Sequence, residues 1–168
     1  MNNITLIGMP GAGKSTIGVL LAKRLGYAFH DTDITIQVQT GKTLAQLMLD
    51  IGGDALMEVE SNIIASLDPC REVIATGGSA VFGKNGMANL QRCSQIVYLK
   101  VSLEEIERRV GDLVARGVVL NGCKDVRELY DQRVPLYEQY AQITLDCDGK
   151  SVEQCVDELC GLIGRNGR

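Results

Sequence analysis

Aromatic side chains are scarce in this chain of 168 residues. Tryptophan is absent, and phenylalanine, tryptophan and tyrosine together make up 4% of the sequence. Proteins that bind single-stranded nucleic acid stack successive bases on aromatic rings. The formal net charge of −4 and the pI of about 5.0 also argue against binding driven by bulk positive charge. We therefore expect no nucleic-acid partner.

Long hydrophobic runs and metal-binding cysteine patterns are missing as well. No stretch approaches the ~20 apolar residues that cross a bilayer. The N-terminal MNNIT lacks the positive segment of a secretory signal. The six cysteines include no CxxC pair and the chain has one histidine, so the sequence does not indicate a zinc site. We expect free thiols in a reducing compartment, and hence a cytoplasmic protein without a membrane partner.

Short apolar strands alternate with helical segments along the chain. Hydrophobic runs predict strands at residues 4–7, 27–30, 72–75, 95–101 and 143–145. Helical spacing predicts helices at 14–25, from 33 onward, at 43–67 with an interruption at Gly52-Gly53, from 102 onward, at 125–139 and at 151–164. The strands lack a two-residue alternation, which is typical of a parallel sheet covered by helices on both faces. The length fits one domain, so we predict a single α/β domain over residues 1–168.

Three helix starts have their own signal in the sequence. "SLEE" at Ser102–Glu105 has the pattern of a capping box. "DVRE" at Asp125–Glu128 is a second start signal, and "SVEQ" at Ser151–Gln154 starts the last helix. Gly26 stands where the C-cap of the first helix belongs.

The segment "GMPGAGKST" after the first strand matches the phosphate-binding pattern G-x-x-x-x-G-K-[ST]. Its glycines allow backbone N–H groups to turn toward an anion, and the following helix adds a partial positive charge at its N-terminus. The alternative, a plain turn, would not need a Lys-Ser pair at this point. We predict a nucleoside triphosphate site formed by Gly11, Ala12, Gly13, Lys14, Ser15 and Thr16.

The remaining sequence narrows the class of phosphate-loop protein. No N-K-x-D guanine motif follows, which argues against a GTPase switch. The chain is also too short for a helicase or a transporter ATPase. By analogy with small α/β proteins of this size, we expect a kinase that phosphorylates a small molecule.

Two carboxylates, Asp31 and Asp33, follow the second predicted strand in "HDTD". Alternation along an extended chain would point both toward the crevice where the phosphate loop lies. One could support Mg²⁺ and the other could accept a proton from an attacking hydroxyl. As an alternative, an aspartate before a helix acts as its N-cap, and Asp33 could do that.

Two glycine-rich segments complete the candidates. Gly77 and Gly78 would let a ligand approach the backbone closely, or form an ordinary turn. Residues 111–124 are predicted to form an active-site lid. Arg116 in this segment could close over a transferring phosphoryl group, or be solvated. Arg133 lies on the helix after the lid and is a further candidate; its alternative is a surface ion pair.

Together these motifs resemble the shikimate kinase family over nearly the whole chain. The matching pieces are "GMPGAGKST", "DTD", "TGGS", the lid and "QRVPLY". The resemblance implies a five-stranded parallel sheet of the nucleoside-monophosphate-kinase type, in three α/β/α layers, with a mobile lid. It implies transfer of the γ-phosphoryl group of MgATP to the 3-hydroxyl of shikimate, a step of aromatic amino acid biosynthesis.

The resemblance also implies a role for each residue on the donor side. Lys14 would bind the phosphates and take part in catalysis. Ser15 would bind Mg²⁺ and Asp31 would support the metal. Arg109 would lie near the adenine of ATP, and Arg116 would be the catalytic arginine of the lid.

On the acceptor side the resemblance implies four residues. Asp33 would hold the acceptor hydroxyl and act as the catalytic base. Gly77 and Gly78 would line the acceptor site, and Arg133 would pair with the acceptor carboxylate. The small molecule would be the partner of a monomeric enzyme.

The chain departs from the family pattern mainly at the acceptor. The family has a Phe-Arg pair where this chain has Leu56 and Met57, and that arginine clamps the shikimate carboxylate. A methionine cannot make such a charge-assisted bond, which is worth about 1.5–3 kcal/mol. Ser79 replaces the third glycine of the family's triplet, and the lid's Arg-Pro-Leu-Leu reads "RGVVL".

These departures leave three hypotheses open. The first is a shikimate kinase in which Arg133 alone holds the carboxylate. The second is a kinase of the same family that acts on another small hydroxyl compound, because Met57 replaces the arginine. The third is a nucleotide-binding protein without catalytic activity, against which the intact Asp33 argues.

Overall fold

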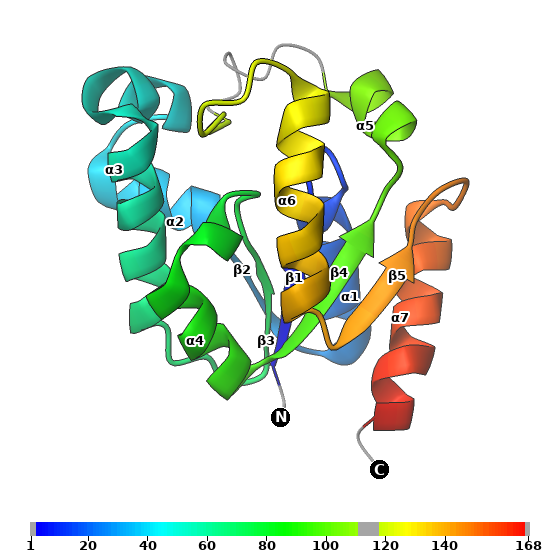
Figure 1. Ribbon diagram of the computed structural model, residues 1–168. Helices are drawn as coiled ribbons and strands as arrows, with labels where there is room; N and C mark the ends of the chain where they lie inside the picture. Colours follow the sequence, from blue (N-terminus) through cyan, green and yellow to red (C-terminus); the bar gives the residue numbers. More distant parts are fainter. Residues whose placement is uncertain (1–2, 111–117, 167–168) are drawn as a thin grey trace.

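Parallel strands form the central layer of the protein in a computed structural model, which describes residues 3–110 and 118–166 (Figure 1). Within these residues the strands form one five-stranded sheet in the order β2-β3-β1-β4-β5. The strands are β1 (Ile4–Ile7), β2 (Ala28–Asp31), β3 (Glu72–Ala75), β4 (Gln95–Lys100) and β5 (Ile143–Asp146). All pairings are parallel, and Ile4 of β1 lies opposite Val73 and Gln95. The predicted parallel sheet is confirmed.

Helices cover both faces of this sheet. The elements are α1 (Lys14–Leu25), α2 (Thr32–Thr40), α3 (Leu44–Ser66), the 3-10 turn η1 (Ala80–Phe82), α4 (Lys84–Cys93), α5 (Leu103–Arg109), α6 (Val126–Tyr140) and α7 (Val152–Asn166). Figure 1 shows α4 and α6 on one face, while α1 and α7 pack together on the other. α3 packs on α4 and α2 beside the β2 edge. The three-layer α/β/α arrangement is confirmed.

Local signals set several of these boundaries. Gly26 ends α1 at φ 67° and donates its N–H to Ala22. The Asp125 carboxylate accepts from the N–H of Glu128 at the start of α6. Ser151 and Gln154 exchange side-chain and backbone hydrogen bonds before α7. These starts and stops were all present in the sequence, because capping depends on residues only a few positions apart.

The predicted capping box at Ser102–Glu105 is wrong, although α5 does begin there. The Ser102 side chain makes no capping bond, and its N–H donates to the Asp148 carboxylate at 3.0 Å. Glu105 instead accepts from Arg108 and Arg109. The backbone N–H of Ser102, which a capping box would pair with Glu105, is therefore bonded to a residue 46 positions away.

α4 was not predicted from the sequence, and its composition explains why. Its sequence, KNGMANLQRC, carries only Met87 and Leu90 as large buried apolar residues. Gly86 lets α4 approach α3 closely, because an added Cβ would lie 3.1 Å from Ile64. Its few apolar residues lie on one face and pack against α3, so the signal in the sequence is short although the packing stabilises the helix.

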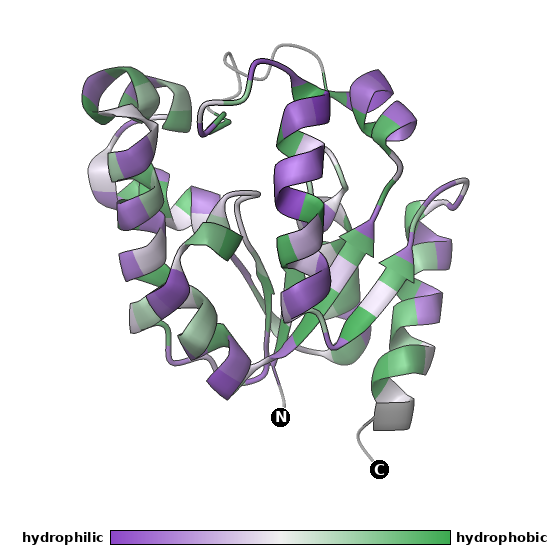
Figure 2. Cartoon of the chain, viewed as in Figure 1, coloured by the Kyte–Doolittle hydropathy of each residue, from purple (hydrophilic) through white to green (hydrophobic). Residues whose placement is uncertain are grey.

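The main core lies between the sheet and its helices. Residues Ile96–Leu99 of β4 are fully buried, and hydrophobic colours follow this strand in Figure 2, whereas the outward turns of α4 and α6 are largely hydrophilic. A second, smaller apolar cluster forms beside α2 and α3 and contains Ile36, Leu47, Leu56, Ile63 and Val119. In the described part of the chain, none of the helices is long and apolar enough to cross a membrane.

Candidate active site

A cavity of about 500 Å³ opens at the carboxyl ends of β1 and β3. Its walls come from the loop after β1, the start of α2, the middle of α3, the loop after β3, the end of α5, residues 118–119 and α6. In parallel α/β sheets, ligands bind at this edge. The fold thus brings the loop Gly8–Thr16 together with residues more than a hundred positions downstream.

The loop after β1 has the backbone geometry of an anion cradle. Gly8, Gly11 and Gly13 all have positive φ, at 146°, 80° and 93°. Gly8 has no room for a side chain, since a Cβ there would lie 2.8 Å from the carbonyl oxygen of Leu99. The Lys14 ammonium donates to the carbonyls of Gly8 and Met9 at 2.8 and 2.9 Å. Burial lowers the pKa of Lys14 to about 8.

Ser15 and Asp31 lie side by side in the fold. The Ser15 hydroxyl donates to Asp31 Oδ2 at 2.6 Å. Asp31 Oδ1 accepts from the N–H groups of Asp33 and Ile34, so Asp31 is the N-cap of α2. The alternative that Asp33 caps this helix is therefore wrong. These adjacent oxygen atoms fit Mg²⁺, which typically takes one or two protein ligands and completes its shell with phosphate and water.

Asp33 reaches the cavity from a helix rather than from a strand. Because α2 begins at Thr32, the predicted strand alternation does not apply to Asp33. The residue nevertheless lines the cavity. Burial raises the pKa of Asp33, and the negative charge of Asp31 raises it further. The raised pKa makes Asp33 a better proton acceptor than an ordinary aspartate.

Close contacts leave no room for a side chain at positions 77 and 78, so both must be glycine. A Cβ at Gly77 would lie 2.4 Å from Glu60 Oε1, and one at Gly78 would lie 2.8 Å from a guanidinium nitrogen of Arg133. Tyr137 donates its hydroxyl to the Gly78 carbonyl at 2.6 Å. An ordinary turn would not explain these contacts, because the glycines let charged side chains lie directly against the backbone.

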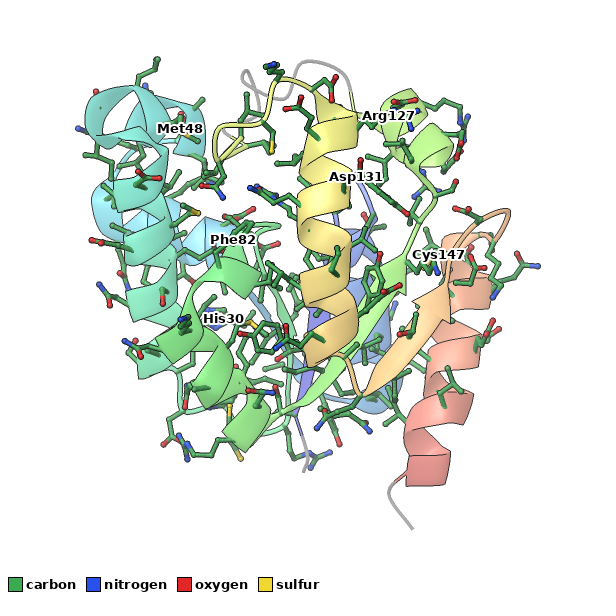
Figure 3. All side chains as sticks on the ribbon, in the orientation of Figure 1. His30, Met48, Phe82, Arg127, Asp131 and Cys147 are labelled. Carbon is green, nitrogen blue, oxygen red and sulfur yellow. The ribbon has the colours of Figure 1, made fainter. Side chains whose placement is uncertain are left out.

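Arg133 is 1% exposed and lines the cavity from α6. The alternative of a surface ion pair is therefore wrong. Its guanidinium donates to the carbonyl of Val119 and lies 5.8 Å from the ring centre of Phe82, which Figure 3 labels between α3 and α6. Its Nε has no hydrogen-bond partner among the described residues. A buried guanidinium that keeps such a free donor is suited to binding an anion.

Glu60 was not among the residues to which the sequence analysis gave a role. It is 3% exposed, lines the cavity from α3 and accepts from the Ser79 hydroxyl at 2.8 Å. Burial and the nearby Asp33 raise the pKa of Glu60 to about 7. The signal available in the sequence was its spacing, since Glu60 lies one helical turn from Leu56 on the buried face of α3.

The comparisons with known proteins agree with one another. The sequence model described as "Shikimate kinase" matches residues 10–163. The chain belongs to the shikimate kinase family. It is 35% identical to shikimate kinase of Salinispora arenicola over 160 residues, which covers 94% of this chain and 95% of the relative.

Solved structures of the family superimpose on nearly the whole chain. Shikimate kinase from Acinetobacter baumannii in complex with shikimate gives a TM-score of 0.85 at 29% identity, covering 98% of this chain and 93% of that one. Shikimate kinase from Bacteroides thetaiotaomicron gives a TM-score of 0.79 at 28% identity, covering 96% of this chain and 98% of that one. The comparisons give no support to the hypothesis of a different acceptor.

The two residues that replace the family's Phe-Arg pair have different surroundings. Leu56 lines the cavity, whereas Met57 is partly buried and packs against the second apolar cluster. Arg109 lines the cavity and pairs with Glu105 at 2.6 Å. Arg116 and residues 111–117 of the predicted lid lie outside the described residues. The roles assigned to all these residues stay predictions.

Proposed function

We propose that this protein is a shikimate kinase, which transfers the γ-phosphoryl group of ATP to a hydroxyl of shikimate. The observation that carries the proposal is the single cavity shared by the phosphate loop, Asp33 and Arg133. A kinase needs its phosphate-binding groups and its acceptor-binding groups within reach of each other. The family membership supports the choice of acceptor.

On the donor side, the glycine loop and Lys14 would hold the phosphates of ATP. Ser15 and Asp31 would hold Mg²⁺, whose oxygen ligands lie next to the loop. When bound, Mg²⁺ neutralises charge on the phosphate oxygens. Arg109, at the end of α5, would lie near the adenine.

On the acceptor side, Arg133 would bind the carboxylate of shikimate with its buried guanidinium. Asp33 would accept the proton of the attacking hydroxyl, whose oxygen forms the new bond to the γ-phosphorus as the bond to the bridging oxygen of ADP breaks. All of these groups come from one chain, so a monomer would be sufficient for the proposed reaction.

The proposal is tested by acceptor-dependent release of ADP. We expect turnover of MgATP with shikimate and little with quinate, gluconate or homoserine. Asp33→Asn should lower kcat by at least about a hundredfold, the typical contribution of a general base, without changing the Kd for ATP. Asp157→Asn, which alters an exposed carboxylate paired with Arg24, is the matched control and should leave kcat unchanged. Clear activity on another acceptor and none on shikimate would contradict the proposal.

A further inference from the structure

Two buried polar atoms of the cavity lack hydrogen-bond partners among the described residues. They are Oε1 of Glu60, an acceptor, and Nε of Arg133, a donor. Buried polar groups in proteins are nearly always hydrogen-bonded. An unpaired acceptor and an unpaired donor on the walls of one cavity therefore indicate a ligand that carries both a donor, such as a hydroxyl, and an acceptor, such as a carboxylate.

The partner of the other glutamate oxygen is Ser79. Its hydroxyl donates to Glu60 Oε2 at 2.8 Å, and the contact is buried. This hydrogen bond determines which carboxylate oxygen is engaged and which one is left free. Ser79 stands where the family has a glycine, which has no side chain to donate, so this hydrogen bond follows from a departure of this chain from the family pattern.

The free oxygen lies on the same side of Gly77 as Asp33. The point where a Gly77 side chain would begin is 2.4 Å from Glu60 Oε1 and 3.0 Å from Asp33 Oδ1. The two carboxylates thus flank one glycine of the acceptor wall. A compound with two hydroxyl groups on neighbouring carbons could offer one hydroxyl to each carboxylate.

We propose that Ser79 is a positioning residue of the acceptor site, which holds Glu60 so that Oε1 accepts a second hydroxyl of the substrate, distinct from the one beside Asp33. The inference rests on the proposed function, because it requires a polyhydroxylated acceptor. The last torsion of a glutamate side chain is soft. The hydrogen bond from Ser79 to Oε2 limits rotation about this torsion, so Oε1 stays beside Gly77 and Asp33.

We expect a change at Ser79 to weaken acceptor binding and to leave ATP binding unchanged. Ser79→Ala should raise KM for shikimate about tenfold, the loss typical of a hydrogen bond to a charged group, with kcat within twofold and KM for ATP unchanged. Ser79→Thr retains the hydroxyl and should restore KM to near the wild-type value. Glu60→Gln should also raise KM for shikimate, and adding Ser79→Ala to it should have little further effect.

Shikimate analogues that each lack one hydroxyl test whether Ser79 positions Glu60 or only packs against the site. For the wild type, kcat/KM should be higher with shikimate than with the analogue that lacks the hydroxyl bound by Glu60. In Ser79→Ala this ratio of kcat/KM values should be about tenfold smaller. Thermal unfolding of each variant reports whether it is folded.

Three results would overturn the inference while leaving the proposed function intact. They are an unchanged KM for shikimate in folded Ser79→Ala, an equal rise in KM for ATP, and an undiminished effect of Ser79→Ala in the Glu60→Gln background. Wild-type protein that neither turns over shikimate nor binds it in calorimetry would instead overturn both proposals.

Discussion

Lys14 shows how its surroundings alter the chemistry of a single residue. The side chain is 8% exposed, and burial lowers the pKa of its ammonium group to about 8. The carboxylates of Asp33, Glu60 and Asp31 oppose this shift, whereas the positive charge of Arg133 adds to it. The loop after β1 therefore carries a cation that loses its charge at only mildly alkaline pH.

We predict that the affinity for ATP in the absence of acceptor falls as the pH rises through about 8. Below this pH Lys14 is charged and attracts the phosphates, and above it the neutral amine does not. The Kd for ATP, measured by calorimetry from pH 6.5 to 9.5, should increase at the alkaline end, above the pKa of about 7 to which burial raises Glu60. Lys14→Arg should lack this transition, because arginine stays charged throughout the range. A flat profile in the wild type would contradict the assignment.

Among the elements, α3 depends most clearly on one residue. Gly52 interrupts the helix with φ 79° and ψ 169°, a conformation that residues with a side chain rarely adopt. The interruption lets the first turns of α3 change direction beside residues 118–119. It was predicted from the Gly52-Gly53 pair, because the requirement is local.

We predict that Gly52→Ala lowers the free energy of unfolding by about 1–3 kcal/mol, the usual cost of forcing a side chain into such a conformation. Gly161→Ala is the matched control. Gly161 has ordinary helical geometry in α7 with open space around it, so alanine there should raise the free energy of unfolding by about 0.4–1 kcal/mol. Urea denaturation measures both. Equal effects of the two substitutions would show that the backbone at Gly52 is not under this constraint.

At the scale of the whole molecule, the solvent exposure of the cysteine thiols shows how tightly the helices pack on the sheet. All six are free thiols. Cys70 is exposed, whereas Cys147 and Cys155 are buried where β5 leads into α7. Burial raises the pKa of the Cys147 thiol, so it is a poor nucleophile in the folded state.

We predict that a thiol reagent modifies Cys70 rapidly in the native protein and that Cys147 and Cys155 react only on unfolding. Mass spectrometry after a short pulse of reagent identifies the modified residues. The same pulse in 8 M urea should modify all six cysteines. Fast modification of Cys147 or Cys155 without denaturant would mean that α7 opens readily from the sheet.

The sequence by itself determined the features that depend on neighbouring residues. The phosphate loop, the caps at Gly26 and Asp125 and the break in α3 each follow from a few adjacent positions. The parallel sheet and its five strands followed from the succession of apolar segments, and the resemblance to one family agreed with that number. Local conformation and hydrophobic spacing operate within a few residues, so they can be read along the chain.

The tertiary structure alone decided which groups meet at the proposed acceptor site. Arg133 could have been a surface residue by its sequence, yet packing buries it against Gly78, 55 positions away in the sequence numbering. The pairing of Ser79 with Glu60 spans 19 positions, and the capping of α2 by Asp31 depended on where β2 ended. Such contacts are set by how the layers pack, because the free energy of burying a charge depends on every element around it.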